Sequence, residues 1–266
     1  MQNPYQAPQS AAPTQVLARV WHAEPSVNTD LKTVWSWLAR SWGMLFGVSV
    51  GISLASAILA RLCITYLPQF LGSLLSMGVS AAFGLVVSAA AIRVVLDHED
   101  GRELGVGKAL RFGFSYFGVL ILPVALRYMF GVIAAMCAFF PTALVQGRLM
   151  AVEALFVLGV EDPSKTVFGG AWELGDGHTF GFAGSWLVLY LPVLLVSGLM
   201  GMIGYGTMVL EWPAWTATAV SLPGGLLIGF MSILSALGGL SRLLSMRHQQ
   251  GLVTEYRWRL MEDLED

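Results

Sequence analysis

The fold is decided by two apolar stretches, WGMLFGVSVGISLASAILARLCIT at residues 42–65 and FLGSLLSMGVSAAFGLVVSAAAIRVVL at residues 70–96. At about 1.5 Å per helical residue, each is long enough to cross the roughly 30 Å hydrocarbon layer of a membrane. The short segment Tyr66-Leu67-Pro68-Gln69 between them predicts a tight turn. We therefore expect two membrane-spanning helices that form a hairpin.

The composition agrees with a membrane protein. Hydrophobic residues make up 56% of the 266 residues, charged residues only 12%, and the mean hydropathy is +0.67. Soluble domains carry about 25% charged residues, so this chain has too little polar surface to stay dispersed in water. The net charge of -2 lacks the basic excess that nucleic-acid binding needs, which excludes that class of partner.

The remaining apolar sequence predicts four further spans, at residues 110–126, 128–149, 180–203 and 223–244. We place the break between the first two at Arg127, because an arginine is costly in mid-membrane and should lie at an interface. Pro141 is expected to kink the following helix. Residues 204–222 are expected to form an interfacial loop. The predicted fold class is all-α, a polytopic bundle of about six spans.

Two terminal regions flank the predicted membrane domain. Residues 1–31 are expected to be a disordered tail, or a short docking peptide, without the features of a secretory signal. A six-span membrane domain covers residues 32–244 and includes an elbow helix near residues 163–174. Residues 245–266 alternate charged and hydrophobic residues, which predicts an amphipathic surface tail.

The basic residues predict the orientation. In the six-span arrangement, all of the 15 lysines and arginines except Arg61 and Arg127 fall on the side that holds both termini. Cytoplasmic loops carry an excess of Lys and Arg, so both termini should be cytoplasmic. We expect a multi-pass protein of the cell inner membrane.

Small residues recur every four positions in the first two predicted helices, which places each set near one face. Lipid removes the hydrophobic drive between helices, so close packing of such faces must hold them together. We expect the two faces to pack mainly against each other, and a homodimer contact is the alternative. The predicted packing residues are Gly43, Gly47, Gly51, Ser76, Ser80 and Gly84.

Residues that could carry chemistry are few. Asp97, His98, Glu99 and Asp100 are metal-ligand types, but a contiguous run is typical of a solvated loop. The GxSxG string at residues 47–51 lies inside a predicted span without His, Asp or Glu, so we interpret its glycines as packing residues. We therefore predict no catalytic, cofactor-binding or metal-binding residue.

One arginine is a candidate for lipid contact. Arg148 and Glu153 are opposite charges near a span, but five positions separate them by about 140° round a helix, so they should not pair. Arg148 is instead expected to extend to a lipid headgroup.

Residues 140–184 carry a family resemblance. Pro141 in a helix, the pair Arg148-Leu149, the segment 157–163 and the run Ala171-Trp172-Glu173-Leu174-Gly175 precede a new span. This order resembles the membrane domain attached to some bacterial glycerophosphodiester phosphodiesterases, and related stand-alone six-span proteins. The resemblance implies a six-span bundle with cytoplasmic termini and an elbow helix at the inner surface. It implies no diesterase activity, because the catalytic barrel is absent.

Three hypotheses for function remain open at this point. The first is a non-catalytic accessory, assembly or scaffold subunit of a membrane complex, with membrane lipids and another membrane protein as partners and no cofactor. It rests on the small-residue faces and on an expected lack of buried charge. The alternative is handling of a lipid or an apolar solute in a cleft between proline-kinked helices, with Arg148 at the headgroup. The third, an intramembrane enzyme, has no supporting constellation.

Overall fold

The computed structural model describes residues 25–102, 104–137, 139–158, 167–209 and 214–249, and this part of the chain is helical without strands. Its elements are α2 (Val27–Tyr66), α3 (Gln69–Glu99), α4 (Val106–Cys137), α5 (Phe139–Arg148), the 3-10 helix η1 (Leu149–Ala151), α6 (Val152–Leu158), α7 (Val167–Leu174), α8 (Thr179–Val209) and α9 (Ala214–Gln249).

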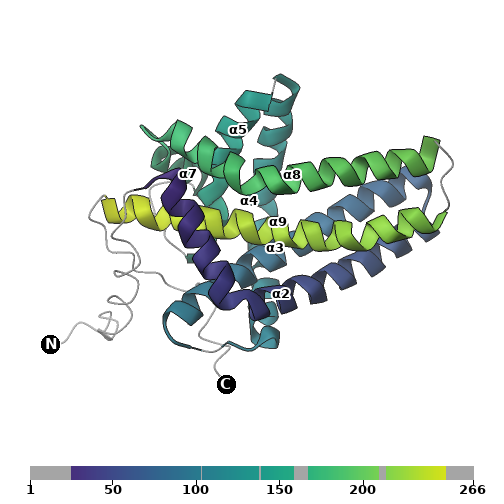
Figure 1. Cartoon of the computed structure of the whole chain (residues 1–266), viewed down its shortest axis with the longest axis horizontal. Helices are drawn as coiled ribbons and strands as arrows, with labels where there is room; N and C mark the ends of the chain where they lie inside the picture. Colours follow the sequence, from purple (N-terminus) through teal and green to yellow (C-terminus); the bar gives the residue numbers. More distant parts are fainter. Residues whose placement is uncertain (1–24, 103, 138, 159–166, 210–213, 250–266) are drawn as a thin grey trace.

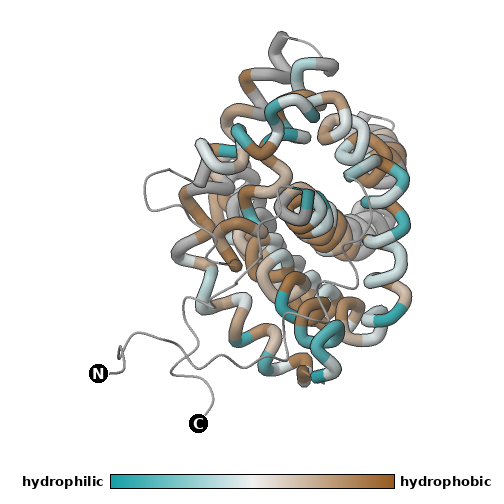
Figure 2. The backbone as a smooth tube through the Cα atoms, turned by 90° about the vertical axis from the view of Figure 1, so that its left-hand side faces the viewer, coloured by the Kyte–Doolittle hydropathy of each residue, from teal (hydrophilic) through white to brown (hydrophobic). Residues whose placement is uncertain are grey.

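Four long helices, α2, α3, α8 and α9, form an elongated bundle (Figure 1). The end of α2 and the start of α3 lie at the same extremity as the end of α8 and the start of α9, at the right of Figure 1. We call the opposite extremity the polar end. It is formed by the starts of α2 and α8 and the ends of α3 and α9, and Figure 2 looks onto it, where hydrophilic and hydrophobic residues mix.

Apolar helices of membrane-spanning length are present. Within the described residues, Val27–Ser56, Pro141–Leu158 and Gly229–Met246 are long and apolar enough to cross a membrane, and the bent pair Val106–Gly118 and Leu120–Arg127 would be a fourth. Large apolar side chains are exposed along α2 and α8 mostly at intervals of three, four, seven or eight residues, which places them near one outward face of each helix. These features indicate a membrane-embedded helical protein, with three to four candidate spans.

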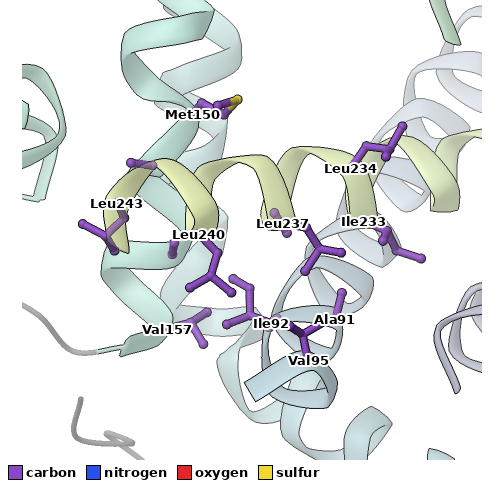
Figure 3. Packing of buried hydrophobic residues seen from close by; sticks show 14 of the residues in the cluster. Ala91, Ile92, Val95, Met150, Val157, Ile233, Leu234, Leu237, Leu240 and Leu243 are labelled. Carbon is purple, nitrogen blue, oxygen red and sulfur yellow. The ribbon is translucent and has the colours of Figure 1, made fainter. Parts of the chain in front are cut away.

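Helix α9 is the centre of the core. Its buried Ile233, Leu237 and Leu240 lie between α3, which contributes Ile92 and Val95, and the segment formed by η1 and α6 (Figure 3). The backbones approach closely here: a Cβ atom at Gly239 would overlap the main-chain oxygen of Met150 in η1. α9 therefore organises the neighbouring helices around it.

The first helix starts earlier than predicted. It begins at Val27, where the Ser26 hydroxyl caps it by accepting a hydrogen bond from the Thr29 amide at 3.1 Å. The prediction of a tail over residues 1–31 is wrong for residues 27–31, and residues 1–24 lie outside the described part. The helix bends at Ser41, which has non-helical backbone angles (φ -104°, ψ 15°). The start predicted at residue 42 therefore coincides with this bend inside α2.

The break in the long apolar run is also displaced. α4 continues through Arg127 to Cys137, so the predicted boundary after Arg127 is wrong. Pro141 lies in the first turn of α5. Backbone amides in the first turn have no partner within the helix, so a proline there removes no hydrogen bond and the expected kink is absent. The sharp bend is in α4 instead, where Val106–Gly118 and Leu120–Arg127 meet at 69°.

The loop predicted over residues 204–222 is mostly helical, because α8 extends to Val209 and α9 starts at Ala214. Residues 210–213 lie outside the described part. The elbow predicted near residues 163–174 contains α7, although its first four residues are not described. Of the predicted C-terminal tail, residues 245–249 belong to α9, and residues 250–266 are not described.

The predicted packing of small residues is wrong at two positions. Within the described residues, Gly43 and Gly51 have no neighbour, and a Cβ atom at Gly47 would meet Val106 of α4 rather than a residue of α3. Gly84 does pack closely, but against Ser232 of α9. The side chains of Ser76 and Ser80 lie outside the described part.

Close backbone contacts occur at other glycines. A Cβ atom at Gly147 would lie 2.7 Å from the Ala183 amide nitrogen, which joins α5 to α8. One at Gly229 would lie 2.5 Å from the Ser49 hydroxyl oxygen, which joins α9 to α2. Ser49, the serine of the GxSxG string, is therefore a buried packing residue.

Candidate functional site

The polar end is held together by buried charges. The Arg242 Nη2 of α9 lies 2.6 Å from the Asp30 Oδ2 of α2, and both side chains are at most 1% exposed. Ser185 of α8 and Ser241 of α9 donate to the same carboxylate, at 2.6 and 3.0 Å. Three helices, α2, α8 and α9, thus meet at one carboxylate.

The acidic run at the end of α3 is used in ion pairs. Asp97 pairs with Arg93 one helical turn earlier, at 2.5 Å, and Glu99 pairs with Arg40 of α2, at 3.2 Å. The Arg93 guanidinium also lies over the Phe112 ring of α4, 5.5 Å from its centroid. Among the described residues, no group of three or more His, Cys, Asp or Glu side chains could hold a metal ion.

Arg148, the predicted headgroup residue, is held at the turn between α7 and α8. Its Nε donates to the Thr179 hydroxyl at 2.9 Å, and its Nη2 donates to Asp176 at 2.8 Å. The guanidinium lies over the Trp172 ring, 4.5 Å from the centroid, and the side chain is 13% exposed. As predicted, Arg148 does not pair with Glu153, and its observed partners fix the turn.

A second polar group lies deeper in the bundle, which we call the deep polar cluster: Arg127 of α4, Gln146 of α5, Glu153 of α6 and Ser88 of α3. The Arg127 Nη1 donates to the Glu153 Oε1 at 2.9 Å, and its Nε donates to the Gln146 Oε1 at 3.1 Å. Ser88 lies beside the Glu153 carboxylate and donates to the main-chain oxygen of Ser232 at 3.3 Å. The cluster joins four helices that surround the core.

The depth of the cluster follows from α3. Ser88 precedes the end of this helix at Glu99 by eleven residues, which correspond to about 16 Å of helix. The interfacial position of Arg127 stays a prediction, but its side chain does not extend from the bundle: it is 5% exposed and paired with Glu153. The partner lies 26 positions away in sequence, so local spacing could not reveal it.

This arrangement also corrects the expected lack of buried charge. Removing two charges from water is costly, and paired charges at membrane depth are rare and often functional. The Oε2 atom of Glu153 is buried and has no hydrogen-bond partner among the described residues. The cluster can therefore accept a hydrogen-bond donor or a proton at this atom.

Comparisons with known proteins identify no relative. No protein-family model matches the chain, and no curated protein or solved structure matches it at a significant level.

Proposed function

We propose that the chain is a six-span protein of the cell inner membrane with both termini in the cytoplasm. The six crossings would be α2, α3, α4, the α5–α6 segment, α8 and α9. An even number of crossings agrees with the start of α2 and the end of α9 lying together at the polar end. Along α2 and α3, Arg61 is the one charged residue between positions 44 and 92, which supports assigning the opposite extremity to the outer side.

We further propose that the protein works by binding, as an accessory or scaffold subunit of a membrane complex. The observation that carries this proposal is the outward face of α2. Among the described residues, no atom lies within 4 Å of a Cβ atom built at Gly43 or Gly51, and Trp42 and Phe46 beside them are about half exposed. Small residues that leave room for another backbone favour helix association in lipid, so this face suits a helix of a partner protein.

The experiment is gentle purification from the native membrane followed by mass spectrometry of all bound components. We expect a protein partner at fixed ratio with the natural chain, and its loss in a Gly43→Leu/Gly51→Leu variant. Gly118→Leu is the matched control, because Gly118 is also exposed without a neighbour, on α4. Retention of the partner by the double variant would contradict the role of this face.

The second candidate is handling of a lipid or an apolar solute. The deep polar cluster favours it, because paired charges at membrane depth often line a solute path. In the same experiment, one enriched lipid class without any protein partner would support this function and contradict the accessory role. Loss of that lipid in Arg148→Ala would then assign Arg148 to its headgroup.

The proposed kinship with the membrane domains of bacterial glycerophosphodiester phosphodiesterases rests on residues 140–184. The position of α7 before α8 and the contact of Trp172 with Arg148 support the elbow that this kinship implies.

A further inference from the structure

The carboxylate of Glu153 is buried, and within the described residues only one of its two oxygen atoms accepts a hydrogen bond. Its side chain is 5% exposed, its Oε1 accepts from Arg127, and its Oε2 has no partner among the described residues. A buried carboxylate oxygen without a donor is costly, and uptake of a proton relieves the charge. We propose that Glu153 is a proton-binding site, and that its protonation releases Arg127 and loosens α4 from α6.

The groups that face Glu153 favour a reversible site. Among the elements packed on α6, α4 presents Arg127, and α3 presents the uncharged Ser88. The nearest charges on α3, Arg93 and Asp97, are paired with each other, and Arg242 of α9 is paired with Asp30. η1 contains no charged residue, and Glu173 of α7 is exposed. Within the described chain, Arg127 is therefore the charged partner of Glu153, and the Ser88 hydroxyl is a further group that favours the ionised carboxylate.

Arg127 is the link between proton uptake and movement. It lies in the second arm of the bend in α4, at the end of the segment Leu120–Arg127, and the helix continues beyond it to Cys137. Its guanidinium fastens that arm to α6 through Glu153 and to α5 through Gln146, whose Nε2 donates back to the Arg127 main-chain oxygen at 3.4 Å. When Glu153 becomes neutral, a buried guanidinium loses its counter-ion, and the arm has to move to bring it toward water or headgroups.

The proton balance of this step is simple. One proton from the aqueous phase adds to Glu153 Oε2, the carboxylate becomes a carboxylic acid, and the ionic contact between Arg127 Nη1 and Glu153 Oε1 is broken. The net charge of the cluster changes from zero to +1. Acidic conditions therefore favour the loosened arrangement, and neutral or alkaline conditions favour the paired one. This inference does not depend on the proposed partner protein.

Infrared spectroscopy tests proton binding directly. The full chain in lipid nanodiscs is titrated with acid, and the carbonyl stretch of a protonated carboxyl group is recorded in H₂O and D₂O. We expect an isotope-sensitive band that grows as the pH falls, is lost in Glu153→Gln and is retained in Glu173→Gln, whose site is exposed on α7. A band that survives Glu153→Gln, or none in the natural chain, would overturn the proposal.

Hydrogen exchange tests the movement. Exchange of residues 120–127 is compared with that of residues 179–191 in the same sample, which removes the intrinsic effect of pH. We expect the ratio to rise several-fold on acidification of the natural chain, and to be high at every pH in Glu153→Gln. If that variant does not fold, the titration of the natural chain decides alone. A ratio that does not change with pH would show that the cluster only holds the helices together, and would refute the proposed loosening of α4 on protonation.

Discussion

At the scale of single residues, the structure depends on charges that are buried together. Asp30 and Arg242 are almost fully buried, and two serines complete the hydrogen bonding of the carboxylate. Forming such a pair contributes little net free energy, because both ions lose their water. Removing one partner of the pair is strongly destabilising, because the remaining ion stays buried without a counter-charge.

Asp30→Ala should therefore lower the free energy of unfolding by about 3–5 kcal/mol, since it leaves Arg242 unpaired. Denaturation of the purified protein in mixed micelles measures this loss. Asp176→Ala is the control: Asp176 is 66% exposed in its pair with Arg148, so we expect a loss below about 1 kcal/mol. Equal losses in the two variants would show that burial does not set the cost.

None of these pairs is predicted from the sequence, because Asp97 is expected in a solvated loop, although local spacing could have indicated one of them. Arg93 and Asp97 stand four positions apart on one helix, a spacing at which side chains meet. Asp30 lay in a predicted tail, and Arg127 and Glu153 lay in separate predicted elements, so nothing local paired them with their partners. Their pairing depends on how the helices assemble, which a single sequence does not display.

At the scale of helices, close contact is set by a few glycines. Gly239 of α9 faces the backbone of η1, and Gly147 of α5 faces the backbone of α8. Both contacts are between backbones, so the smallest added group has no room. The glycines that repeat every four residues on α2 mostly lack such a neighbour.

Gly239→Ala should destabilise the protein by about 1–3 kcal/mol, because the new methyl group must push α9 away from Met150. The same denaturation assay measures the change. Gly118→Ala should be neutral or slightly stabilising, since its Cβ atom meets no neighbour and alanine favours a helix. A neutral Gly239→Ala would mean that α9 and η1 approach less closely than the structure indicates.

Hydropathy predicts the existence of the long helices but not their limits. The apolar stretches at residues 42–65 and 70–96 lie within α2 and α3. The additional turns of α2 are amphipathic and begin at the cap formed by Ser26, so a search for apolar length misses them. In the long apolar run, Arg127 suggested an interface because its counter-ion was unknown.

At the scale of the whole molecule, charge is distributed unevenly along the bundle. The ion pairs of Asp30, Arg93 and Glu99 lie at the polar end, and the deep polar cluster is the next layer inward. The proposed orientation assigns the polar end to the cytoplasm. Exposed positions at the two extremities of the bundle allow this to be tested.

A cysteine at Arg102, in the turn after α3, should react with an impermeant thiol reagent only after the cells are opened. A cysteine at Tyr66, which is 78% exposed at the other extremity, should react in intact cells. Both are placed in a chain whose Cys63 and Cys137 are replaced by serine. The reverse pattern would invert the proposed orientation, and labelling of both sites in intact cells would exclude a membrane barrier between them.

The pairing of α2 with α9 has a consequence for synthesis. Asp30 emerges from the ribosome early, while Ser241, which binds it, lies 211 positions later. At about 5–20 residues per second, this carboxylate waits roughly 10–40 s for its partners. During that interval Asp30 of α2 lacks the arginine that neutralises it in the folded protein. A chain truncated before α9 would lack this arginine permanently, so its α2 would keep an acidic group without a counter-ion.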